Sequence, residues 1–147
     1  MNQNKELNST FQTKRSYAYT PEEIFSAFAD PLRLAKWWGP QGFTNTFQVF
    51  EFKNNGLWEF MMHAPNGENY PNRSVFAQVE LNKKIVIKHI VQPLFTLTID
   101  LVPEGNKTTL IWTQKFDDAK VAESMKHIVI KANEENLDKL NINLQQR

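Results

Sequence analysis

The C-terminal stretch from about Asp118 to Leu144 constrains the fold more than any other part of the sequence. Its apolar residues recur at steps of three and four, which places them along one side of a helix. Asp117 and Asp118 suit the N-terminal cap, and no Pro or Gly interrupts the run. At 1.5 Å per residue this helix would be roughly 40 Å long, so it needs a broad apolar surface to lie on. The apolar set is Val121, Met125, Ile128, Val129, Ala132, Leu137, Leu140 and Leu144.

The residues before this helix predict such a surface. Six segments have the composition and bounding turns of β-strands, and the short connections between them favour antiparallel neighbours. In one of them, Phe95, Leu97, Ile99 and Leu101 alternate with polar residues, which is typical of a sheet with one wet and one covered face. The six predicted strands are 43–53, 57–63, 70–81, 84–91, 94–102 and 107–116.

The N-terminal part predicts one more strand and two short helices. Residues 1–9 are polar and are expected to form a flexible lead-in, and 10–19 have a strand-like pattern. Thr20 before Pro21, with Glu23 following, is a helix start with a capping box, and Asp30 before Pro31 repeats the signal. We therefore expect an α+β fold in one domain spanning 10–147. A curved antiparallel sheet of about seven strands would wrap a long C-terminal helix, with two short helices between strands 1 and 2.

Composition limits the classes of partner. Of 147 residues, 41% are hydrophobic, including eleven Phe and four Trp, so the chain can form a core and also line an apolar pocket. Seventeen basic residues nearly cancel sixteen acidic ones, which gives no electrostatic reason to expect nucleic acid or an anionic membrane as partner. The chain has no cysteine, no secretory signal pattern and no run of eighteen apolar residues. We expect a cytoplasmic protein without membrane insertion.

A strongly curved sheet around a long helix often leaves a cavity between them. Strand alternation predicts which side chains face that space, although a completely filled core would produce the same pattern. The predicted inward set is Phe50, Phe52, Trp58, Phe60, Met62, Ala77, Val79, Ile85, Ile87, His89, Leu97, Ile99, Leu110 and Trp112.

Several local motifs, in this order and spacing, resemble one known family. Three segments carry the resemblance: Asp30-Pro31 leading into Trp37-Trp38-Gly39-Pro40-Gln41-Gly42-Phe43-Thr44, the hairpin Glu51 to Gly56, and Met62 to Gly67 followed by Tyr70. They are similar to the "DP…WWGP-x-GFT", acidic-x-basic-x-Gly-Gly and "M-x-x-P-D-G…Y" segments of the heat-shock-protein-90 ATPase activator homologue-like family. This family belongs to the START / birch-pollen-allergen (SRPBCC) superfamily. The chain departs from its pattern at Asn55 and Asn66, which replace a Gly and the Asp.

The resemblance covers nearly the whole chain from Phe11 onward and implies the helix-grip fold. It implies function far less strongly, because related folds carry apolar ligands, act as cyclases or modulate a chaperone. A chaperone partner is therefore expected by family analogy alone.

The leading hypothesis is non-catalytic binding of a small apolar or amphipathic molecule between the sheet and the C-terminal helix. His89 and Gln114 would be polar handles, although the more common role for each is that of a hydrogen-bonded core residue, or for His89 a position at the wet end of a strand. Trp38 could be a lid or a structural aromatic. The predicted ligand contacts are Trp38, Phe50, Trp58, Phe60, Met62, Ile87, His89, Leu97, Trp112, Gln114, Met125 and Val129.

Two other functions stay open at this point. One is a chaperone-interaction protein with an external working surface. The other is a cyclase or dehydratase, which needs an acid–base pair, and the sequence offers only His89 without an inward carboxylate. Three scattered histidines lack carboxylates at ligand spacing, so we predict no metal site, and no motif indicates a cofactor or a catalytic nucleophile. A homodimer formed through a sheet edge or through exposed aromatic side chains is compatible with the sequence.

Overall fold

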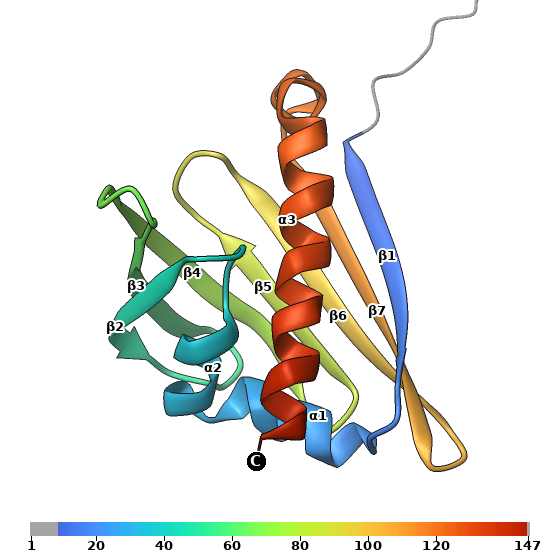
Figure 1. Ribbon diagram of the computed structural model, residues 1–147. Coiled ribbons are helices and arrows are strands. Elements are labelled where there is room, and N and C mark those ends of the chain that lie inside the picture. The colour runs from blue at the N-terminus through green and yellow to red at the C-terminus, as the bar shows by residue number, and fades with distance from the viewer. Residues whose placement is uncertain (1–8, 147) are drawn as a thin grey trace, which may run out of the picture.

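A seven-stranded antiparallel sheet curves around one long helix in the computed structural model, which describes residues 9–146 (Figure 1). This arrangement confirms the predicted helix-grip fold. The strands lie in the order β1-β7-β6-β5-β4-β3-β2, so strands adjacent in sequence pair except where β1 joins β7. The predicted lead-in lies outside the described residues apart from Ser9. The elements are β1 (Thr10–Tyr17), α1 (Pro21–Ala29), α2 (Pro31–Trp37), β2 (Thr44–Phe50), β3 (Gly56–His63), β4 (Asn69–Glu80), β5 (Lys84–His89), β6 (Phe95–Glu104), β7 (Lys107–Phe116) and α3 (Ala119–Gln145).

The three helices begin where their capping residues predict. Thr20 and Glu23 form a reciprocal capping box, in which Thr20 Oγ1 accepts from Glu23 N at 3.2 Å and Glu23 Oε1 accepts from Thr20 N at 2.9 Å. The Asp30 side chain caps α2 by accepting from Leu32 N at 2.9 Å. Asp118 caps α3 by accepting from the backbone N–H of Lys120 at 2.8 Å. These bonds satisfy helix N–H groups that have no partner within the helix.

A bulge in β4 makes one predicted inward residue wrong. The pairing of β4 with β5 shifts between Phe76 and Gln78, so Ala77 is an extra residue and is exposed. Phe76 and Ser74 are buried in its place, at 1% and 2% exposure. After the bulge the alternation is restored in the opposite parity, and Val79 again packs on the core. A one-residue shift is enough because side chains alternate faces along a strand.

The two halves of α3 pack differently. Leu137, Leu140 and Leu144 in its C-terminal half are almost completely buried in the main core. Ala122 and Val129 in the N-terminal half belong to a separate, smaller apolar cluster. Ile128 was expected on the apolar side but is 69% exposed, because a neighbour of the inward-facing Val129 points about 100° away around the helix. No helix in the described part of the chain has the length and apolar character needed to cross a bilayer.

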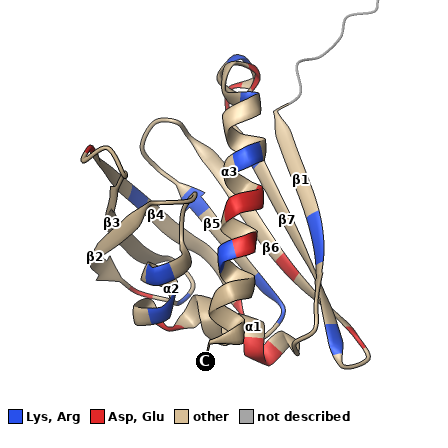
Figure 2. Cartoon of the chain, viewed as in Figure 1, with Lys and Arg blue, Asp and Glu red and all other residues tan. Residues whose placement is uncertain are grey.

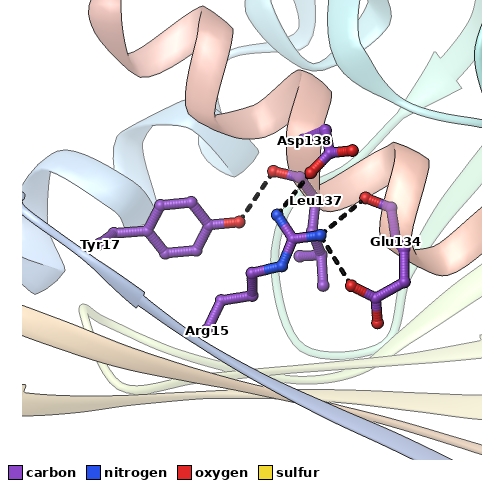
Figure 3. Close-up of polar contacts among 5 residues, drawn as sticks. All are labelled: Arg15, Tyr17, Glu134, Leu137 and Asp138. Atoms are coloured by element: carbon purple, nitrogen blue, oxygen red, sulfur yellow. Dashed lines mark hydrogen bonds and ion pairs between the residues drawn. The ribbon is translucent and has the colours of Figure 1, made fainter.

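Arg15 of β1 ties the sheet to the middle of α3 (Figure 3). Its guanidinium donates to a Glu134 carboxylate oxygen and to an Asp138 carboxylate oxygen, both at 2.7 Å, and to the Glu134 backbone carbonyl at 3.0 Å. Beside it, the Tyr17 hydroxyl donates to the Leu137 carbonyl at 2.9 Å. The hydrogen bond from Arg15 lowers the pKa of the Glu134 carboxyl. These contacts hold α3 across the sheet just beyond the point where its N-terminal half separates from the main core.

Candidate functional site

An open cavity of about 970 Å³ lies between the sheet and α3. The strands supply one wall, α3 supplies another, and the segments 38–43 and 91–93 complete the lining. Tyr70 and Ile128 belong to this lining and are 44% and 69% exposed, so the cavity opens to solvent. Its volume lies at the upper end of the range of about 300–1,000 Å³ typical of small-molecule pockets. The curved sheet therefore does not close completely on the helix.

Nine of the twelve predicted ligand contacts line this cavity: Trp38, Phe60, Met62, His89, Leu97, Trp112, Gln114, Met125 and Val129. The other three, Phe50, Trp58 and Ile87, do not. Trp58 and Ile87 are buried in the main core, at 1% and 3% exposure, and Phe50 packs against it. Strand alternation finds the covered face of the sheet, but it does not separate the part under the cavity from the part under packed side chains. For the nine residues that line the cavity, contact with a ligand stays a prediction.

Trp38 forms the boundary between the cavity and the packed core. It follows α2, and its ring centroid lies 5.1 Å from that of Trp58 and 5.6 Å from that of Trp112. Trp58 continues the cluster by stacking on Phe60 at 4.4 Å and on Phe76 at 5.5 Å. Trp38 thus has a structural contact on one side and the cavity on the other. These ring contacts agree with the structural role considered for Trp38, and its role as a lid stays a prediction.

The sequence reasoning missed several lining residues. Phe43 was placed in a strand but lies just before β2, in the segment that lines the cavity. Pro93 comes from a loop between strands, where no periodic pattern exists to place a side chain. Asn133 and Asn136 do follow Val129 at the helical spacing of four and seven residues, and both line the cavity. Spacing alone could have found these two, but their polarity excluded them from an apolar list.

Both ring nitrogens of His89 lie within hydrogen-bonding distance of neutral groups. Its Nδ1 lies 2.7 Å from the Pro93 carbonyl oxygen, its Nε2 lies 2.9 Å from Asn72 Oδ1, and its ring stacks on Phe95 at 4.6 Å. The side chain is 6% exposed, and this burial lowers the pKa of His89. Among the described carboxylates, none forms a hydrogen bond with His89. A neutral imidazole carries one N–H, so it donates to only one of these two oxygens, and it accepts from Asn72 only if that amide is turned end for end. The geometry therefore supplies an oriented imidazole, and not the acid–base pair that the cyclase hypothesis requires.

Acidification should destabilise the protein through His89. Because its pKa is lower in the folded state, the unfolded chain binds the proton more readily, and stability present above about pH 6.5 is lost as the pH falls below that value. The loss can reach about 1.4 kcal/mol per pH unit, since one group takes up at most one proton. Urea unfolding of the wild type and His89→Gln between pH 7.5 and 5.5 measures this, and the variant should show the flatter dependence. His127→Gln, at an exposed position on α3, should behave as the wild type. Equal slopes for all three proteins would contradict the assignment.

Amide side chains form a polar patch on an otherwise apolar wall. Asn133 Nδ2 donates to Gln114 Oε1 at 3.0 Å, joining α3 to β7. Asn136 is 6% exposed, and its Oδ1 has no hydrogen-bond partner among the described residues. Trp112 Nε1, from the same wall, also lacks one within this part of the chain. A buried polar group without a partner costs roughly 1–3 kcal/mol. Trp58 Nε1 and Asn45 Oδ1 are in the same position within the described residues, but Trp112 and Asn136 are the two that line the cavity.

Charge is nearly absent from the lining. Glu59 and Arg73 are its charged members, and they pair with each other at 2.8 Å. Elsewhere both signs are scattered over the helices and strands (Figure 2). Within residues 9–146 no three His, Asp or Glu side chains gather at metal-binding distance.

The fold has close counterparts among solved structures. A protein from Arthrobacter aurescens superposes with a TM-score of 0.86 at 18% identity, covering 98% of this chain and 91% of its own. A protein from Nitrosomonas europaea gives 0.84 at 18% identity, with coverages of 93% and 94%. The AHSA1 protein of Silicibacter pomeroyi gives 0.75 at 20% identity, with coverages of 93% and 98%. At such identities the likeness concerns the fold.

Comparison with curated proteins finds no match for the chain. A family model does match, over residues 18–145, and its description is "Activator of Hsp90 ATPase homolog 1-like protein". This match spans most of the chain and agrees with the motifs around Trp37 to Thr44. The chain belongs to the family of Activator of Hsp90 ATPase homolog 1-like proteins.

Proposed function

We propose that this protein binds a small apolar or amphipathic molecule, without catalysis, in the cavity between the sheet and α3. The observation that carries the proposal is the open cavity of about 970 Å³ with mostly apolar side chains around it. A protein that used only its outer surface would have no need of such a space, since filling it with side chains would add stability. Trp38, Phe60 and Trp112 offer flat ring surfaces, and Met62 and Met125 offer adaptable ones.

The expected affinity is moderate. A ligand that buries about 300 Å² of apolar surface gains about 7.5 kcal/mol at 25 cal/mol per Å². Lost translational and rotational freedom offsets part of this gain. Without this offset, about 7.5 kcal/mol corresponds to a dissociation constant of a few micromolar. The offset moves the expected constants above that value, to roughly tens of micromolar to millimolar, unless polar groups add further contacts.

Filling the cavity should weaken binding. Ala132 lines it from α3, so Ala132→Trp places an indole in the space that a ligand would use. We expect the uncharged fluorescent probe N-phenyl-1-naphthylamine to bind the wild type with a dissociation constant above a few micromolar, and Ala132→Trp at least about tenfold more weakly. Fluorescence titration measures both, and thermal unfolding checks that the variant is folded. Ala18→Trp, at an exposed position between β1 and α1, is the matched control. Absence of binding to the wild type, or equal binding by all three proteins, would refute the proposal.

A chaperone-interaction role is the second candidate, and the family description is what favours it. In that case the working surface is external, and filling the cavity leaves activity intact. Stimulation of the ATPase of purified heat-shock protein 90 by the wild type and equally by Ala132→Trp would support this role. If the wild type neither stimulates this ATPase nor binds the purified chaperone, the chaperone-interaction role is excluded.

A further inference from the structure

The polar patch of the cavity wall is built from neutral amides on two elements. Gln114 of β7 is 8% exposed and is bound by Asn133 of α3 at 3.0 Å. Asn136, one turn further along α3, is 6% exposed, lines the same cavity and has an Oδ1 without a partner among the described residues. This part of the cavity wall therefore has two independent features. One is an amide pair that faces the cavity, and the other is a nearby buried acceptor that has no hydrogen-bond donor.

The pair has a defined hydrogen-bonding character. Asn133 Nδ2 uses Gln114 Oε1, which leaves the Gln114 amide nitrogen as a donor and the Asn133 carbonyl oxygen as an acceptor. Within the described chain neither of these two atoms has another partner, and neither is enclosed by protein. Exchanging the two ends of both amides still leaves one donor and one acceptor. Asn136 Oδ1 is a further acceptor nearby, but it is enclosed by protein, so a ligand reaches it only after the side chain shifts.

The charges around the amide patch limit which chemical class of ligand the cavity can bind. The charged lining residues Glu59 and Arg73 neutralise each other, and the described structure gives the amide patch no ion pair. A carboxylate or ammonium group placed beside Gln114 would lose its hydration without gaining a counter-charge. An uncharged group that both donates and accepts fits instead, and a hydroxyl is the smallest such group.

We infer that the cavity selects uncharged, hydroxyl-bearing apolar ligands, whose hydroxyl accepts from one amide of the Gln114–Asn133 pair and donates to an amide oxygen of the patch. This inference rests on the proposed function and adds the ligand class and the residues that recognise it. Apolar walls supply affinity, and the amides set the orientation of the ligand and disfavour carboxylate and ammonium groups.

Three biphenyl probes separate the effects of hydrogen-bond donation, hydrogen-bond acceptance and charge on binding. 4-Hydroxybiphenyl donates and accepts, 4-methoxybiphenyl only accepts, and biphenyl-4-carboxylate is charged. By isothermal titration calorimetry at neutral pH, we expect the wild type to bind the hydroxyl compound about tenfold more tightly than the methoxy compound, and the carboxylate most weakly. In Gln114→Met and in Asn133→Leu the preference for hydroxyl over methoxy should fall to about onefold, with the methoxy affinity retained.

Gln12→Met is the matched control, because Gln12 is exposed and donates to Thr113 on the outer side of the sheet. It should keep the wild-type preference. Retained methoxy binding shows that a variant still has its cavity, and Asn133→Leu carries the test if Gln114→Met does not fold. An unchanged preference in the folded variants, or a carboxylate that binds the wild type as well as the hydroxyl compound, would overturn the inference and leave the proposed function standing. Failure of all three probes to bind the wild type would overturn both.

Discussion

Trp58→Ala is expected to lower the free energy of unfolding by about 3–5 kcal/mol, the usual cost of removing a large buried ring. Trp58 is 1% exposed and lies at the centre of the aromatic cluster behind the cavity. Its ring stacks on Phe60 and on Phe76 and meets Trp38 edge to face. Truncation would leave a space that this rigid cluster cannot refill, because its other members are held by the sheet.

Urea unfolding with Trp58→Phe as the control measures this effect. Trp58 Nε1 has no hydrogen-bond partner among the described residues, so phenylalanine keeps a stacking ring and removes an unsatisfied donor. We expect this variant to lose well under half of what the alanine variant loses. A loss below about 1 kcal/mol for Trp58→Ala would mean that the cluster is not packed as described.

Gly56→Ala is the second substitution with a large expected effect, about 3 kcal/mol of destabilisation. Gly56 begins β3, and a Cβ added there would lie 1.8 Å from the Glu51 backbone oxygen and 2.9 Å from that of Lys53. Both atoms belong to the turn that returns β2 into β3, where Gly56 N donates to Lys53 O at 2.8 Å. Backbone cannot yield as a flexible side chain can, so the hairpin itself must open. Chemical unfolding of the variant gives the cost.

Gly67→Ala is the variant with which Gly56→Ala should be compared. Gly67 has a φ of 91°, which a side chain adopts at a cost of about 1 kcal/mol, but nothing lies within 4 Å of an added Cβ. The residue with ordinary backbone geometry should therefore be the more sensitive of the two. A larger loss at Gly67 than at Gly56 would show that dihedral strain, and not close approach, decides these sites.

Local chemistry made most of the architecture predictable. Thr20, Asp30 and Asp118 are helix caps whose partners lie two or three residues away, so their hydrogen bonds depend on the immediate sequence alone. Alternation in β6 placed Leu97 on the covered face, where it is 2% exposed. Ala77 was assigned to the wrong face because a bulge depends on how β4 meets β5, and not on the residues of β4 alone.

The site was less predictable than the fold, and Trp58 and Trp112 show why. Both alternate inward and both are 1% exposed, yet Trp112 lines the cavity and Trp58 lies in the packed core. Periodicity reports which side of an element faces the interior, because it is a property of one segment. The cavity, the loop residues around it and the meeting of Gln114 with Asn133 depend on sheet curvature and on where α3 crosses β7. Those are relations between segments far apart in the chain, and they exist only once the sheet and the helix have packed.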